Sequence, residues 1–182
     1  VILVGEIRDN ETLQVVLQAT LTGHLVLTTL HANTSSQAVQ RLLDIGAEPF
    51  VLNSALSAVV SQRLVRVLCE ECKRRVDVDL SGQPAGVRQY IESLPPRQFH
   101  EPVGCERCHV GYWGRRAVHE VLVMDDGMRS AVAGRQGEAS IHRAARRAGM
   151  RSIFEDGLRL AAEGVTSLAE VFRVVPLEEQ EY

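Results

Sequence analysis

The chain begins with VILVGEIRD over residues 1–9. Its continuous apolar run, residues 1–4, predicts a buried strand of a parallel sheet that ends at Gly5. Leucines and valines then recur at helical spacing, with Asn10 as the expected N-cap. A second aliphatic and β-branched run spans residues 25–29. The order strand, helix, strand is typical of a parallel α/β sheet, in which ligands bind beyond the carboxyl ends of the strands.

Polar side chains follow both predicted strands where each one ends. Gly5 and Glu6 come directly after the first strand, and Thr29 and His31 close the second. Because the carboxyl ends of parallel strands meet at one sheet edge, we expect these residues to lie close together. A carboxylate just past a buried strand is where P-loop NTPases hold Mg²⁺ or orient the attacking water. The joint pattern predicts a phosphate site, although each part alone is also typical of a solvated turn or a helix cap.

These residues do not complete a catalytic centre. A P-loop has the motif GxxxxGK[ST], in which the lysine reaches the β- and γ-phosphates. The sole lysine of the sequence, Lys73, lies between Cys72 and Arg74. We therefore expect that these 182 residues alone do not hydrolyse ATP. Since the chain opens inside a strand-like run without a methionine, we also expect it to be a fragment.

The remaining pattern predicts further helices and two short strands. Helices are expected up to Gly46, from Pro49 through Ser61, around residues 87–94 and, with breaks at glycines, from Asp125 onward. Strands are expected at residues 65–68 and 116–123.

The four cysteines form two pairs, Cys69-x-x-Cys72 and Cys105-x-x-Cys108, with 32 residues between them. Two such knuckles are the usual way to supply four thiolates to one tetrahedral Zn²⁺. Zinc ribbons usually have a gap of about 15–20 residues, so residues 77–102 are expected to form an inserted excursion. Four protein ligands leave no position for a substrate, which predicts a structural role.

Alternatives to this zinc site stay open at the level of sequence. The cysteines could form two disulfides or remain free, although disulfides are rare in cytosolic proteins. His100 or His109 could replace a thiolate. The module could also bind nucleic acid through nearby arginines, with Tyr112 and Trp113 stacking on bases. A net charge of −3 and glutamates inside both knuckles favour zinc without a nucleic-acid partner.

The composition is that of an ordinary globular protein, with 45% apolar and 24% charged residues. No apolar run reaches the roughly 18 residues of a membrane-spanning helix. No signal-peptide pattern is present either. We therefore expect a cytoplasmic protein that reaches a membrane only through partners.

Several segments resemble the ATPases of type II secretion and type IV pilus assembly. VGEIRD, ending at Asp9, resembles their Walker B segment, and TGHLVLTTLHAN over residues 22–33 resembles their His box. QRLVR before Cys69 and the glycine-rich run after Cys108 resemble the two ends of their tetracysteine module. Residues 149–171 resemble their helical tail, so the likeness covers nearly the whole chain in order.

The resemblance implies an α/β fold with three parts. Residues 1–66 would be the C-terminal part of a RecA-like P-loop ATPase domain. Residues 67–116 would be an inserted tetracysteine zinc module, and residues 117–182 a mostly helical C-terminal subdomain.

The resemblance also implies roles for the residues at the strand ends. Glu6 would act at the magnesium and water site, and His31 would lie near the γ-phosphate, which makes both catalytic. Arg8 would belong to the nucleotide-site shell or to a subunit contact. Gly5 and Thr29 would complete the nucleotide-binding set.

For the full-length protein, the resemblance implies a homo-hexameric ATPase that uses ATP and Mg²⁺ and carries structural Zn²⁺. It would be cytoplasmic and peripheral at the inner membrane, held by a membrane platform and cytoplasmic docking proteins, without inserting into the bilayer. Type II secretion and type IV pilus assembly are not separated by these motifs. The alternative is a non-catalytic, zinc-containing docking or scaffold protein related to these ATPases.

Overall fold

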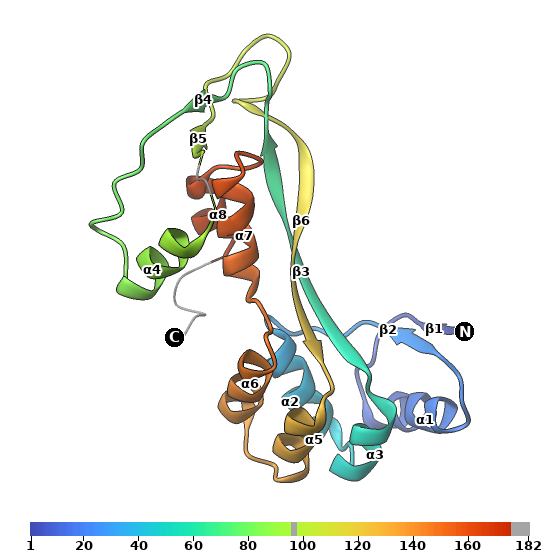
Figure 1. The fold of residues 1–182 in the computed structure, drawn as a ribbon. Coiled ribbons are helices and arrows are strands. Elements are labelled where there is room, and N and C mark those ends of the chain that lie inside the picture. The colour runs from blue at the N-terminus through green and yellow to red at the C-terminus, as the bar shows by residue number, and fades with distance from the viewer. Residues whose placement is uncertain (96–97, 176–182) are drawn as a thin grey trace. The chain divides into compact units, whose positions relative to one another are not determined.

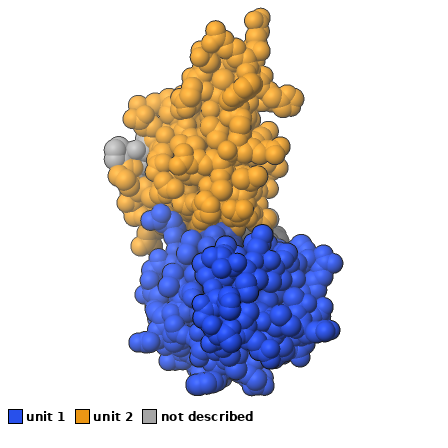
Figure 2. Space-filling model, turned by 90° about the vertical axis from the view of Figure 1, so that its right-hand side faces the viewer, with its two compact units in different colours: residues 1–61, 120–151 blue, residues 62–119, 152–182 orange. Residues whose placement is uncertain are grey.

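The structure is a computed structural model that describes residues 1–95 and 98–175. The chain divides into two compact units, each built from two separate stretches (Figure 2). Unit 1 comprises residues 1–61 and 120–151, and unit 2 comprises residues 62–119 and 152–182. The segment predicted as one helical subdomain, residues 117–182, thus contributes to both units.

Figure 1 shows how the helices and strands follow one another along the chain. Unit 1 holds β1 (Ile2–Val4), α1 (Asn10–Leu21), β2 (Val26–Thr28), α2 (Ser35–Ile45), α3 (Pro49–Ala55), α5 (Asp126–Ala133) and α6 (Glu138–Arg147). Unit 2 holds β4 (Arg74–Arg75), α4 (Ala85–Ser93), β5 (His100–Glu101), α7 (Ile153–Ala162) and α8 (Leu168–Val174). The unit boundaries fall within β3 (Ala58–Leu68) and β6 (Tyr112–Val123), which pair with each other.

The predicted strand, helix, strand opening is confirmed. β1 and β2 are parallel, with Leu3 opposite Leu27, and α1 connects them. The N-cap of α1 is Asp9 and not Asn10 as predicted, because the Asp9 carboxylate accepts the N–H of Thr12 at 2.8 Å. That hydrogen bond lowers the pKa of Asp9.

The prediction that β1 is buried is wrong for one of its two faces. Side chains alternate along a strand, so Val4 and Val26 pack against the core of unit 1. Leu3 points the other way and is 80% exposed. No described residue covers that face of the two-stranded sheet.

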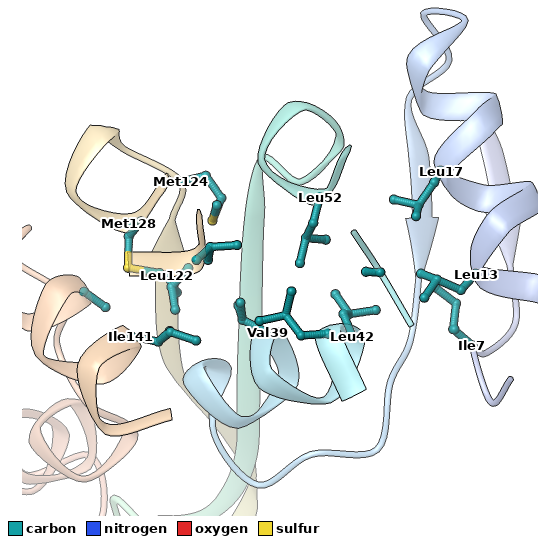
Figure 3. Packing of buried hydrophobic residues seen from close by; sticks show 14 of the residues in the cluster. Ile7, Leu13, Leu17, Val39, Leu42, Leu52, Leu122, Met124, Met128 and Ile141 are labelled. Carbon is teal, nitrogen blue, oxygen red and sulfur yellow. The ribbon is translucent and has the colours of Figure 1, made fainter. Parts of the chain in front are cut away.

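The core of unit 1 joins five helices to the end of β6 (Figure 3). Each helix contributes apolar side chains at helical spacing, which is why these segments form helices that pack by one face. The labelled members include Leu13 and Leu17 of α1, Val39 and Leu42 of α2, Leu52 of α3, Met128 of α5 and Ile141 of α6.

The predicted helix from Pro49 through Ser61 is wrong in its second half. α3 ends at Ala55, and β3 begins at Ala58. The spacing of small apolar residues here fits a helix, but the β-branched residues that follow are paired with β6 instead. Tertiary pairing also makes β3 and β6 longer than the strands predicted at residues 65–68 and 116–123.

The core of unit 2 lies between α4, α7, α8 and the adjoining parts of β3 and β6. Phe154 of α7 is fully buried, and its ring centroid lies 5.7 Å from that of Phe172. Ser152 caps α7 with a full capping box, since it exchanges hydrogen bonds with Glu155. The predicted helix at residues 87–94 and the predicted series of helices after Asp125 are both confirmed.

Within residues 1–95 and 98–175, no helix has the length and apolar character that crossing a membrane requires.

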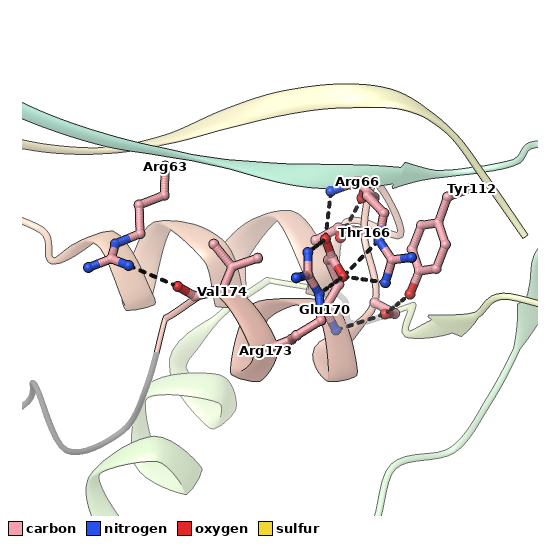
Figure 4. Close-up of polar contacts among 8 residues, drawn as sticks. Arg63, Arg66, Tyr112, Thr166, Glu170, Arg173 and Val174 are labelled. Atoms are coloured by element: carbon pink, nitrogen blue, oxygen red, sulfur yellow. Dashed lines mark hydrogen bonds and ion pairs between the residues drawn. The ribbon is translucent and has the colours of Figure 1, made fainter. Parts of the chain in front are cut away.

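A buried carboxylate ties α8 to β3 in unit 2 (Figure 4). Glu170 is 1% exposed and accepts the backbone N–H of Arg66 at 3.0 Å. The guanidinium groups of Arg66 and Arg173 donate to the same carboxylate at 2.6 and 2.7 Å. The Arg66 guanidinium also lies 4.0 Å from the centre of the Tyr112 ring, and the Tyr112 hydroxyl lies 2.7 Å from Ser167 Oγ.

The two arginines decide the charge state of Glu170. Burial raises the pKa of this carboxyl, but hydrogen bonds from Arg173 and Arg66 outweigh burial and lower the pKa to about 2. The ordinary value is 4.5. The ionised group therefore stabilises the folded state fully above pH 4.5, and this contribution is lost as the pH falls from 4.5 towards 2.

We expect Glu170→Gln to lower the free energy of unfolding at pH 7 by about 3 kcal/mol, the value of the pKa shift. The difference from wild type should shrink between pH 4.5 and 2. Urea unfolding of both proteins across this range measures it. The control is Glu163→Gln, which breaks the exposed ion pair with Arg159 and should cost under about 1 kcal/mol. Equal losses of unfolding free energy in the two variants would contradict the stabilising role of the Glu170 carboxylate.

Candidate functional site

Two hydrogen bonds join the residues that follow β1 and β2. The Thr29 hydroxyl donates to the carbonyl oxygen of Gly5 at 2.6 Å. The Ile7 N–H donates to the carbonyl oxygen of Thr29 at 3.1 Å. Both bonds extend the parallel pairing beyond the strands themselves, so that the residues after β1 and β2 stay side by side.

The Glu6 carboxylate lies between a histidine and an arginine at this sheet edge. His31 Nε2 is 3.0 Å from Glu6 Oε1, and Arg8 Nε donates to Glu6 Oε2 at 2.6 Å. The Glu6 side chain is 17% exposed, whereas that of His31 is 81% exposed. The structure thus brings together all the residues predicted from the strand ends, including Gly5 and Thr29.

The side chains at this sheet edge can bind polar ligands and transfer protons. A carboxylate can hold a water or a cation. An imidazole can donate or accept a proton beside it. The ion pair with Arg8 and the contact with His31 hold both carboxylate oxygens of Glu6 in place.

A polar pocket of about 450 Å³ opens beside His31. Its lining comes from the His31 loop, from one face of α2 and from the start of α6: Ala32, Asn33, Gln37, Gln40, Arg41, Asp44 and Glu138. Of these residues, only His31 is predicted from the sequence as part of a site. The spacing of Gln37, Arg41 and Asp44 at helical intervals is the pattern that indicates a shared polar face of α2.

The four cysteines converge on one point in unit 2. Their sulfur atoms all lie within 4.8 Å of one another. Cys69 Sγ is 4.0 Å from Cys105 Sγ, and Cys108 Sγ is 3.7 Å from the sulfurs of both Cys72 and Cys105. Four sulfurs at about 2.3 Å from a zinc ion form a tetrahedron with edges near 3.8 Å. The cluster is therefore close enough to hold a single metal ion of this size.

Backbone contacts bring the two knuckles together. The Cys69 N–H donates to the carbonyl oxygen of Gly111 at 2.9 Å, which joins the end of β3 to the start of β6. Gly111 has a φ of +83°, and a Cβ there would lie 2.4 Å from the Cβ of Pro102. Only glycine fits this close approach, which brings together the two chain segments that flank the second knuckle.

Backbone N–H groups also point at the sulfurs, as two-residue knuckles predict. Gly104 N–H donates to Cys72 Sγ and Cys105 N–H donates to Cys108 Sγ, both at 3.3 Å. Burial raises the pKa of the Cys72 thiol to about 11. Burial also raises the pKa of Cys108, but the N–H groups of Cys105 and Gly111 outweigh it and bring the value to about 7.

The structure bears on three alternatives to a four-cysteine zinc site: disulfide bonds, histidine ligands and nucleic-acid binding. The cysteines are free, at distances far above the ~2.05 Å of a disulfide bond. Among the described residues, the group that could hold a metal contains neither His100 nor His109. Tyr112 is buried beneath Arg66, so its ring is not available to stack on a base, whereas Trp113 is exposed.

Comparison with known proteins gives close relatives over nearly the whole chain. It is 46% identical over 175 residues to the type II secretion system protein E of Aeromonas hydrophila, covering 96% of this chain and 34% of that protein. It is 45% identical to the type IV pilus assembly ATPase PilB of Thermus thermophilus, covering 94% of this chain and 19% of that protein. The chain therefore spans about a third or less of the length of these relatives.

A solved structure shares the fold. The ATPase DotB of Legionella pneumophila superposes with a TM-score of 0.60 over 93% of this chain and 36% of that one, at 20% sequence identity.

The family described as type II/IV secretion system protein matches residues 1–173. That match takes in both strand ends and all four cysteines. This chain belongs to the family of type II/IV secretion system proteins.

Proposed function

We propose that the full-length protein hydrolyses ATP to drive type II secretion or type IV pilus assembly. The observation that carries the proposal is the contact between Glu6, His31 and Arg8 at the carboxyl edge of two parallel strands. The relatives named above, which include a pilus assembly ATPase, support the same reading. The fold would be RecA-like in residues 1–66, with a zinc module in residues 67–116 and a helical subdomain in residues 117–182.

Each residue of the site has a distinct part in this proposal. Bound ATP with Mg²⁺ would supply the phosphoryl group and the charge neutralisation. Glu6 would orient the attacking water or a water on the metal, and His31 would hydrogen-bond near the γ-phosphate. Arg8 would fix the Glu6 carboxylate or reach a neighbouring subunit. Thr29 and Gly5 would keep the two strand ends in register through their hydrogen bond.

We also propose that the four cysteines hold a structural Zn²⁺. The sulfur distances match a tetrahedral site, and the donor set is closed, with no place for a substrate.

For the whole protein we propose a homo-hexamer on the cytoplasmic side of the inner membrane. Its partners would be a membrane platform and cytoplasmic docking proteins. These points follow from the family resemblance and not from contacts within this chain.

The coding sequence upstream of Val1 tests the proposal without any assay. We expect an in-frame GxxxxGK[ST] motif there, because ATP hydrolysis requires one and the sole lysine of these 182 residues, Lys73, follows Cys72 and belongs to no such motif. An in-frame stop codon immediately before Val1, or a start codon there without such a motif upstream, would contradict it. That outcome would favour the non-catalytic docking or scaffold protein.

A further inference from the structure

A buried glutamate outside the predicted site holds the first turn of α2. Glu120, on β6, is 3% exposed. Its Oε1 accepts the backbone N–H of Ser35 at 2.8 Å, across 85 positions of sequence. Ser35 is the first residue of α2 and is fully buried. The bond therefore joins a strand to the start of the helix that follows the His31 loop.

The chemistry of a helix start explains why a carboxylate is suited to this place. The first N–H groups of a helix have no partner within the helix. The helix dipole also favours a negative charge there. The Ser35 hydroxyl adds contacts of 3.1 Å to Ser61 Oγ and 3.4 Å to the Glu120 carbonyl oxygen. The start of α2 is thus fixed to both β3 and β6.

Glu120 is not needed merely to cap the helix. Thr34 is already the N-cap of α2, and its side chain accepts the N–H of Gln37. A buried carboxylate costs desolvation free energy, whereas a local cap does not. The bond from Glu120 instead fixes where the helix lies against the sheet.

Other hydrogen bonds hold the His31 loop at both of its ends. On one side, Gln37 Oε1 accepts the N–H of Asn33 at 2.7 Å, which ties the end of the loop to the first turn of α2. On the other side, Thr29 is bonded to the residues after β1. His31 lies between these two fixed points, 3.0 Å from Glu6.

We propose that Glu120 is a positioning residue of the ATPase site, which sets the place of His31 against Glu6 by anchoring the start of α2. This inference rests on the proposed function of Glu6 and His31. The proposed role depends on the position of the Glu120 oxygen that accepts the Ser35 N–H, and not on the negative charge of the carboxylate.

Two substitutions in the full-length protein distinguish the effect of the oxygen's position from the effect of the side chain's charge. Glu120→Gln keeps the length and an acceptor oxygen, and we expect kcat for ATP hydrolysis within about threefold of wild type. Glu120→Asp keeps the charge but withdraws the oxygen by about one bond length. We expect it to lower kcat roughly tenfold or more with KM for ATP within about twofold, because small misplacements near reacting groups are costly.

The control is Glu170→Asp in unit 2, the same substitution at another buried carboxylate. Glu170 also accepts a distant backbone N–H, that of Arg66, at 3.0 Å. We expect this variant to lose stability but to keep kcat per folded protein. The inference is overturned if Glu120→Asp keeps the wild-type kcat, or if Glu120→Gln loses kcat as strongly as Glu120→Asp. The proposed function fails separately, if wild type shows no hydrolysis or Glu6→Gln keeps it.

Discussion

Full-length protein carrying Glu6→Gln should bind ATP at least as tightly as wild type and hydrolyse it roughly 10²- to 10⁴-fold more slowly. The substitution keeps the shape of the side chain and removes its charge. Glutamine can still occupy the position between His31 and Arg8, but it cannot take a proton from water or attract a cation as a carboxylate does. Tight binding is retained because the affinity for phosphates comes mainly from a P-loop.

Steady-state phosphate release and equilibrium binding of a fluorescent ATP analogue measure the two effects separately. The matched control is Glu11→Gln, an exposed glutamate in the first turn of α1. It removes the same charge a few residues away and should leave turnover within about twofold of wild type. Normal turnover in Glu6→Gln would remove Glu6 from the catalytic set. Equal losses in both variants would point to net charge and not to this carboxylate.

Removing the metal should unfold the two cysteine knuckles, residues 69–72 and 105–108 with their flanking residues, before the rest of the chain. Binding to four thiolates contributes about 10–16 kcal/mol to the folding of small zinc modules. The segment between the two knuckles has support of its own, because α4 packs into the core of unit 2 and β4 pairs with β5. Without the metal, four sulfurs that lie within 4.8 Å of one another would keep only weak hydrogen bonds, such as those from the N–H groups of Gly104 and Cys105.

The test is to treat the protein with a strong chelator and to measure the release of the metal by elemental analysis. We expect one zinc per chain at the start and rapid tryptic cleavage at Arg74, Arg75 and Arg107 after its removal. Cys105→Ser should behave like the stripped protein. His109→Gln is the control, because His109 follows a ligand but lies outside the metal-binding group, and it should keep the full zinc content. Unchanged proteolysis after complete metal removal would contradict the structural role.

Local sequence patterns predicted the parts of this chain whose geometry is set over short distances. The apolar runs at residues 1–4 and 25–29 predicted the parallel pair, because a short helical crossover leaves few other topologies. The same order placed Glu6 and His31 at one edge. The spacing within Cys69–Cys72 and Cys105–Cys108 likewise predicted a common centre for their sulfurs.

The features that sequence missed depend on contacts between distant segments. Residues 58–61 fit a helical pattern by spacing, and only pairing with β6 makes them a strand. The exposure of Leu3 follows from which face of β1 is covered, and periodicity in one segment does not carry that information. The bond from Glu120 to Ser35 joins positions 85 apart, and no local pattern marks its two ends as partners.

The proposed site is tested most directly by the rate of ATP hydrolysis of two proteins, residues 1–182 alone and the full-length protein. We expect Mg²⁺-dependent turnover by the full-length protein and none above background by residues 1–182. Turnover by residues 1–182 alone would show that Glu6 and His31 work without a P-loop and would contradict the assigned site. A full-length chain that contains GxxxxGK[ST] and binds zinc, yet releases no phosphate, would contradict the proposed ATPase function.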